Sequence, residues 1–155
     1  MREILFRGKT TYGEWVYGSL ILADNYCCIL QSVDDVHPLD YPYLDGVMGT
    51  FDGEATPVIP ETVGQFTGLL DKNGTKIFEG DICNLTMLST VYAVVKIIIQ
   101  HGCVGFEPIS PSEVHPDDRE WKCFWDNEER ELWSSEYFTV VSNIHDGQTY
   151  TVPKK

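Results

Sequence analysis

Few residues in this chain have the types and spacing that metal binding requires. His101 and Cys103 are two positions apart, so on a strand or turn their side chains can share one face, and both residue types bind zinc. No second pair shows zinc-site spacing, and a structural zinc requires a complete set of protein ligands. We therefore interpret His101 as a surface residue and Cys103 as a buried thiol, and we expect no metal and no cofactor.

Two other combinations suggest chemistry. Cys27 and Cys28 are adjacent, but neighbouring residues of a strand point to opposite faces, so a disulfide between them would be strained and two core or half-buried thiols are favoured. His145 and Asp146 resemble a base with its orienting acid, yet Gly147 follows them directly, which favours a turn where Asp146 bonds local backbone. Nucleophile, phosphate-binding and metalloprotease motifs are missing from the sequence, so we predict a protein without catalytic residues.

An acidic, tryptophan-rich segment is the strongest candidate for binding. Residues 107–136 contain ten acidic and three basic residues, a net charge of −7, and three of the four tryptophans of the chain. Such a segment can bind a basic protein, because its charges steer the encounter and its indole rings fill pockets. A solvated insertion whose aromatic rings pack on the protein itself is the alternative. The candidate binding residues are Trp121, Trp125, Trp133, Glu128 and Glu129.

Composition limits the classes of partner. The 155 residues include 24 acidic and 11 basic side chains, a net charge of −13, and such a surface repels nucleic acid phosphates and anionic membranes. The longest apolar run, Val91–Ile99, contains Lys96 and is too short to span a membrane. Five cysteines without a C-x-x-C pair, and an N-terminus without an apolar signal segment, predict a cytoplasmic protein.

Strand patterns dominate the chain and predict a mainly β fold. The expected strands are residues 3–7, 14–22, 26–31, 63–67, 76–78, 81–85, 90–100, 103–107 and 138–144. Residues 33–56 are expected to be a long loop or a pair of weak strands. In residues 117–133 the large apolar residues fall partly at helical spacing, so a short helix beginning at Asp117 stays open beside a loop.

Two turns are predicted with a physical reason. Asp71-Lys72-Asn73-Gly74 separates two apolar runs, and Asn and Gly tolerate the positive φ values of a tight reversal, so Asn73 and Gly74 predict a hairpin. At the following corner Gly80 can adopt backbone angles closed to other residues. The Asp81 carboxylate can accept hydrogen bonds from backbone N–H groups that the corner leaves unpaired.

These blocks together resemble a known family. Residues 1–9 (MREILFRGK), 13–18 (GEWVYG), 61–69 (ETVGQFTGL), 71–74 (DKNG) and 77–82 (IFEGDI) are similar to the YopX family of phage and prophage proteins. Residues 143–146 resemble the last strand and turn of the family, whereas residues 25–56 and 107–137 match no part of the pattern. The resemblance implies a phage or prophage source and an SH3-like barrel in the C-terminal part. It implies no known activity and no catalytic residues.

The expected organisation combines both lines of argument. An N-terminal β-meander region is expected in residues 1–56, and an SH3-like small barrel in residues 57–150, with the acidic insertion at residues 108–137. The function we expect is a non-enzymatic protein-binding module with a basic protein partner, and self-association into a homo-oligomer stays open.

Two other functions remain as alternatives. The first is an acidic mimic of nucleic acid that inhibits a DNA- or RNA-binding protein of the host. The second is a hydrolase or small-ligand binder with a pocket that the sequence does not reveal. Aromatic residues that could line a groove, but for which a role in the core is favoured, are Tyr12, Trp15, Tyr17, Tyr41, Tyr43 and Phe66.

Overall fold

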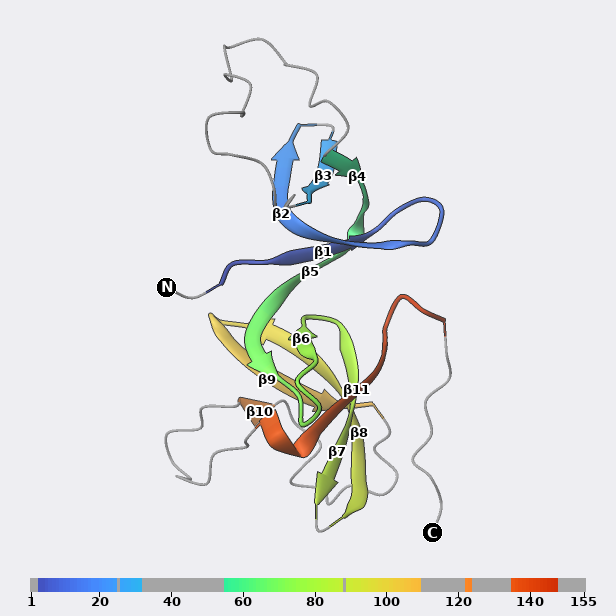
Figure 1. Cartoon of the computed structure of the whole chain (residues 1–155). Coiled ribbons are helices and arrows are strands. Elements are labelled where there is room, and N and C mark those ends of the chain that lie inside the picture. The colour runs from blue at the N-terminus through green and yellow to red at the C-terminus, as the bar shows by residue number, and fades with distance from the viewer. Residues whose placement is uncertain are drawn as a thin grey trace. The chain divides into compact units, whose positions relative to one another are not determined.

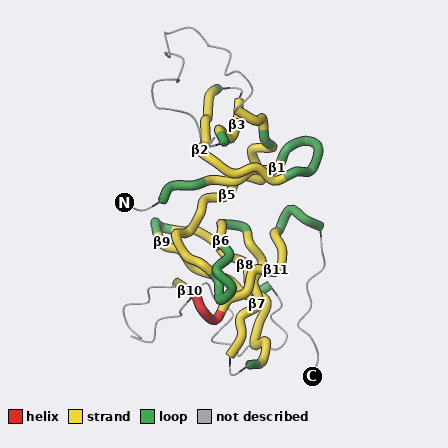
Figure 2. The backbone as a smooth tube through the Cα atoms, in the orientation of Figure 1, coloured by secondary structure: helices red, strands yellow, loops and turns green. Residues whose placement is uncertain are grey.

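The protein is mainly β, as its sequence predicts. The structure, a computed structural model, describes residues 3–24, 26–31, 55–87, 89–109, 122–123 and 135–147. Strands make up most of these residues, and the described part contains one short 3-10 helix, η2 (Ser135–Tyr137) (Figure 2). The chain forms two compact units, an N-terminal unit (Ile4–Gln65) and a C-terminal unit (Met1–Glu3 and Phe66–Lys155).

The N-terminal unit is an antiparallel sheet built from consecutive strands. These are β1 (Phe6–Lys9), β2 (Trp15–Ala23), β3 (Tyr26–Leu30), β4 (Ala55–Pro57) and the first part of β5 (Ile59–Leu70) (Figure 1). Their order in the unit is β4-β3-β2-β1-β5. The sequence did not predict β4, a three-residue edge strand that ends at a proline.

The core of the N-terminal unit is small, and its strands approach each other closely. Ile29 is fully buried beside Cys27 and Val58, and the half-buried residues packed against them are Phe6, Val16, Leu20 and Val63. A Cβ atom added at Gly18 would lie 1.9 Å from the carbonyl oxygen of Leu30, and one at Gly8 would lie 2.8 Å from the Val58 side chain. Only glycine fits at these two positions without displacing the neighbouring chain.

The C-terminal unit contains the longest hairpins. Its strands are the end of β5, β6 (Lys76–Phe78), β7 (Asp81–Met87), β8 (Thr90–Gln100), β9 (Cys103–Pro108), β10 (Lys122–Cys123) and β11 (Phe138–Asn143). The end of β5 pairs with β6, and the other strands form an antiparallel sheet in the order β10-β9-β8-β7-β11. Neither sheet closes into a barrel within the residues that the structure describes.

A larger core holds the C-terminal unit together. Alternate residues of β7 and β8 point into it, as the period of a strand requires. The rings of Phe106 and Phe138 pack with their centroids 5.2 Å apart, and Phe138 is completely buried. The buried cluster consists of Ile77, Cys83, Leu85, Ala93, Val95, Ile97, Phe106 and Phe138.

The nine strand predictions are confirmed in place, two further short strands were not predicted, and the helix left open in residues 117–133 is not formed at the residues described there. Each of the nine expected strands has a counterpart, with ends that differ by a few residues. Within residues 117–133, where a helix or a loop was open, Lys122 and Cys123 form β10, which pairs with β9. The remainder of that stretch, and residues 32–54 of the expected loop, lie outside the described residues. The described residues contain no helix with the length and hydropathy needed to cross a membrane.

Candidate functional site

The turn between β5 and β6 is organised by the Asp71 carboxylate. Its Oδ1 atom accepts hydrogen bonds from the backbone N–H groups of Asn73 at 2.8 Å and Thr75 at 2.9 Å. The backbone N–H of Gly74 donates to the carbonyl of Asp71 at 2.9 Å, and Gly74 has a φ of +82°. The turn predicted from Asn73 and Gly74 is therefore confirmed.

The same carboxylate also reaches a distant strand. Oδ2 of Asp71 accepts a hydrogen bond of 3.0 Å from the backbone N–H of Val140 in β11, and the N–H of Lys72 donates to the carbonyl of Phe138 at 3.1 Å. Asp71 is 6% exposed. Burial alone would raise the pKa of the Asp71 carboxyl, but the donors from Val140, Thr75 and Asn73 together hold this pKa below its ordinary value.

The corner at Gly80 and Asp81 joins three strands. Oδ2 of Asp81 accepts a hydrogen bond of 2.7 Å from the backbone N–H of Phe78, and Gly80 has a φ of +82°. The N–H of Gly80 donates to the carbonyl of Ile97 in β8, and the carbonyl of Gly80 accepts from the N–H of Ile144, which directly follows β11. The predicted roles of Gly80 and Asp81 are confirmed, and the corner fixes the start of β7 against two other strands.

The His145-Asp146-Gly147 stretch is a turn, as predicted, and Asn143 contributes to its hydrogen bonding. The buried Asn143 accepts a hydrogen bond of 2.9 Å from the N–H of His145 at its Oδ1 atom, and its carbonyl accepts from the N–H of Asp146 at 3.1 Å. The exposed Asp146 carboxylate accepts a hydrogen bond from the Ser142 hydroxyl at 3.5 Å. Asn143 therefore makes backbone hydrogen bonds of the kind that were expected of Asp146.

The candidate thiols and the candidate metal ligands differ in burial, and Cys103, which was expected to be buried, is half-buried. Cys27 is buried and Cys28 is half-buried, and both are free thiols, as expected. Burial raises the pKa of the Cys27 thiol, and its neighbours Cys28 and Glu61 act in the same direction. His101 is exposed in the turn between β8 and β9, with a φ of +52°. Within the described ranges no three residues of the metal-binding types gather into a site.

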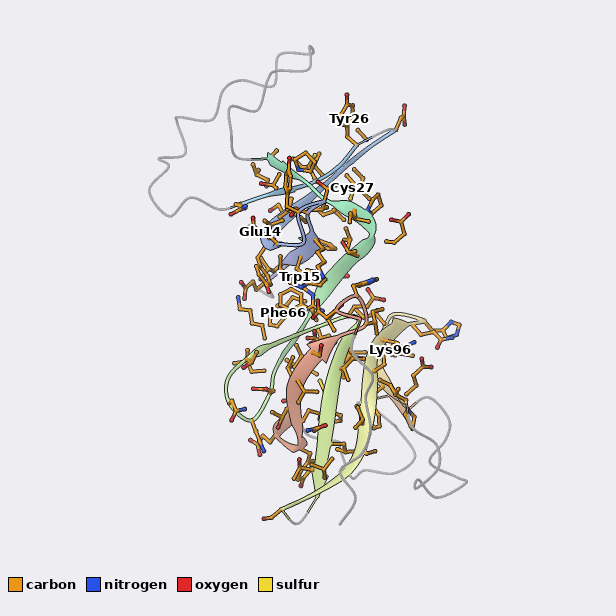
Figure 3. The ribbon with its side chains drawn as sticks, turned by 90° about the vertical axis from the view of Figure 1, so that its right-hand side faces the viewer. Glu14, Trp15, Tyr26, Cys27, Phe66 and Lys96 are labelled. Atoms are coloured by element: carbon orange, nitrogen blue, oxygen red, sulfur yellow. The ribbon has the colours of Figure 1, made fainter. Side chains whose placement is uncertain are left out.

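The aromatic residues that could line a groove fall into different environments. Phe66 is 5% exposed and packs on Phe78 in the C-terminal unit, so the core interpretation is confirmed for it. The same interpretation is wrong for Tyr12, which is 92% exposed, and for Tyr17, which is 46% exposed. Trp15 is half-buried in the N-terminal unit, with the Arg7 guanidinium 4.8 Å from its ring centroid (Figure 3). Tyr41 and Tyr43 lie outside the described residues.

The acidic segment is attached to the C-terminal unit at several points. The backbone N–H of Ile109 donates to the carbonyl of Val94 at 2.9 Å, where the segment leaves β9. It returns at β10, which pairs with β9, and it ends at η2, which leads directly into β11. The candidate binding residues themselves lie outside the described part of the chain, and they are Trp121, Trp125, Trp133, Glu128 and Glu129.

Comparison with known proteins gives one family. The family model described as "YopX protein" matches residues 23–153, which is most of the chain. The matched range includes both aspartate turns, and it also spans residues 25–56 and 107–137, where the sequence showed no resemblance. The N-terminal blocks at residues 1–9 and 13–18 precede it. A search of curated proteins gave no match.

Proposed function

Because the chain belongs to the YopX family, we propose that it is a non-enzymatic protein-binding module of a phage or prophage that acts in the bacterial cytoplasm. Its binding element is the acidic segment, residues 107–136, and its partner is a protein with a basic face. The observation that carries the proposal is the attachment of this charged, tryptophan-rich segment to a well-packed sheet at the end of β9, at β10 and at η2.

Attachment at several points favours binding. A segment held at its ends and in its middle has less conformational freedom to lose when it binds, so more of the contact energy contributes to affinity. The sheet that holds the segment is itself rigid, because its central strands β7, β8 and β9 share the buried cluster of the C-terminal unit. The barrel proposed for this unit is a small SH3-like one, since short turns connect its successive strands from β5 to β9 and their pairing is antiparallel.

The charge of the segment indicates the partner. A net charge of −7 within thirty residues attracts a basic surface, and screening over about 8–10 Å means that salt weakens the attraction between exposed charges. Tryptophan is a frequent energetic anchor of interfaces, and three of the four tryptophans belong to this segment. A basic partner and a strong dependence of affinity on salt are therefore expected.

A second candidate function rests on the same carboxylates. An acidic mimic of nucleic acid would occupy the phosphate-binding site of a host DNA- or RNA-binding protein, and the ten acidic residues of the segment favour it over other classes. Competition distinguishes the two candidates. Duplex DNA displaces the chain from its partner if it is a mimic, and has no effect if the basic face is not a nucleic acid site.

The test is affinity capture from host cytoplasm with the intact chain, followed by affinity measurements on variants. Trp125→Ala is expected to weaken the captured complex by about 2 kcal/mol, the loss of one anchor ring, and to leave the melting temperature unchanged. Trp15→Phe is the matched control, since Trp15 belongs to the N-terminal unit. A large fall in melting temperature with unaltered affinity would instead place the Trp125 ring in the core and contradict the proposal.

A further inference from the structure

One edge of strand β11 is covered by a turn instead of a strand. The N–H and C=O of a strand residue point to the same side, so Phe138 and Val140 present their backbone groups to one edge of β11. The other edge forms the ladder with β7. On the first edge, the Phe138 carbonyl accepts from Lys72 N–H at 3.1 Å, and the Val140 N–H donates to Oδ2 of Asp71 at 3.0 Å.

The sequence of β11 is suited to pairing with another strand. It reads Phe-Thr-Val-Val-Ser-Asn, which is rich in β-branched residues and has no charge, proline or glycine. Segments of this composition add readily to other strands, and natural proteins protect such edges with charges, bulges or covering loops. β11 has a register irregularity between Val140 and Ser142, but no charged residue of its own. Its protection within the described residues is therefore the turn that begins at Asp71.

We propose that the turn Asp71–Thr75 is a displaceable cover over a strand-addition site on β11, and that a second copy of this chain occupies the site when the cover is lifted. A second copy fits because two β11 strands are uncharged and can pair antiparallel without repulsion between like charges. The inference is independent of the acidic segment and of its partner.

The cover depends on the charge of Asp71. An ionised carboxylate accepts hydrogen bonds at both oxygens. A protonated carboxyl carries a hydrogen on one oxygen, and that oxygen is a poorer acceptor for the N–H of Val140 or Thr75. The pKa of Asp71 is lower in the folded protein than in the unfolded chain, so its stabilisation is complete above the ordinary carboxyl pKa and is lost as the pH falls through the lowered value. Strand β11 itself carries no titratable side chain. Those on the adjoining elements are Lys72 in the turn, Lys76 in β6, Asp81 and Cys83 in β7, and Glu136 and Tyr137 in η2.

The experiment compares Asp71→Asn with the parent chain. The asparagine amide keeps one acceptor oxygen and replaces the other by a donor, so it cannot accept from the Val140 N–H while it also accepts from Asn73 and Thr75. In either orientation the turn is held less firmly on β11. We expect the protection of the Val140 amide against hydrogen exchange to fall by about tenfold or more, as for the loss of one charge-assisted hydrogen bond. Light scattering should then detect dimers whose fraction rises with protein concentration.

Thr67→Val is the matched control, because it removes a buried hydrogen bond of 2.7 Å to the Ile77 carbonyl in the same unit without touching β11. This control should remain monomeric with Val140 protected. Unchanged protection of Val140 in Asp71→Asn would overturn the cover, and lost protection without dimers would overturn the strand-addition site.

If Asp71→Asn does not fold, the parent chain is titrated with acid. Loss of Val140 protection together with dimers at a pH where the rest of β7 and β8 stays protected supports the proposal. Loss of Val140 protection only with global unfolding contradicts it.

Discussion

The N-terminal and C-terminal units bury their apolar residues in different ways. The C-terminal unit has a cluster of eight buried side chains, with aromatic rings in contact. Within the described residues the N-terminal unit has a cluster of three buried apolar side chains, and it relies on Gly8 and Gly18, where neighbouring atoms lie so close that no Cβ fits. A small unit gains little from burial, so close backbone approach becomes a larger share of its packing. The two units should therefore differ in which substitutions destabilise them.

The largest effect is expected from Phe138→Ala in the C-terminal unit. Phe138 is completely buried and contacts Phe106, so truncation removes apolar burial and leaves a cavity. The free energy of unfolding should fall by about 3–5 kcal/mol, measured by urea denaturation with amide signals of both units followed separately by NMR. Tyr137→Ala, at a neighbouring exposed residue, is the control. A loss below about 1 kcal/mol would mean that the cluster is not the main source of stability in this unit.

Gly18→Ala is the corresponding substitution in the N-terminal unit. The added methyl group would meet backbone atoms of Leu30, which cannot rotate away, so the strands must separate. We expect a loss of about 3 kcal/mol, at the upper end of the cost of overpacking, seen first in the amide signals of β2 and β3. The exposed neighbour Ser19→Ala should change stability by less than about 0.5 kcal/mol. If Gly18→Ala were as stable as Ser19→Ala, close backbone approach would not limit the N-terminal unit, and the contrast between the units would disappear.

Asp81→Ala should have a smaller effect and act on the corner of the C-terminal unit. It removes the acceptor of the Phe78 N–H inside a buried site, and a net cost of about 1–2 kcal/mol is expected. Thermal melting with near-ultraviolet circular dichroism measures it. A variant that melts with the parent chain would show that the backbone bonds of Gly80 alone hold the corner.

Local features of the fold were predictable from the sequence, and long-range ones were not. Gly74, Gly80 and Asp81 were identified because their roles depend on residues within a few positions. Asp71 was placed in the same turn, but its bond to Val140 links residues 69 positions apart, which no local pattern reveals. β4 and β10 were missed because strands of two or three residues lack a periodic signal. β6 is equally short and was found because the predicted turns at Asn73-Gly74 and Gly80-Asp81 stand on either side of it.

The exposure of the aromatic residues could not be predicted from the sequence either. Tyr17 and Val16 are neighbours on β2 and point to opposite faces of the sheet. Neither face of this strand carries a charged residue, so the sequence did not show which face is exposed to solvent. Cys27 is buried and Cys28 is half-buried, a difference that follows from strand alternation once the core side is known. For the acidic segment, the sequence supplies its charge and the structure supplies its points of attachment.

Strand β5 has a consequence for how the chain folds during its synthesis. Its first part completes the N-terminal unit, so that unit has all its residues once Gln65 has left the ribosome. The C-terminal sheet is complete only with β11, roughly eighty residues later, which takes several seconds or more at synthesis rates of about 5–20 residues per second. During that interval the second half of β5 extends from a unit that can already be folded, while its partner β6 follows almost at once. The earliest element of the C-terminal unit should therefore be the hairpin that carries Asp71, ready before the strand whose edge it covers.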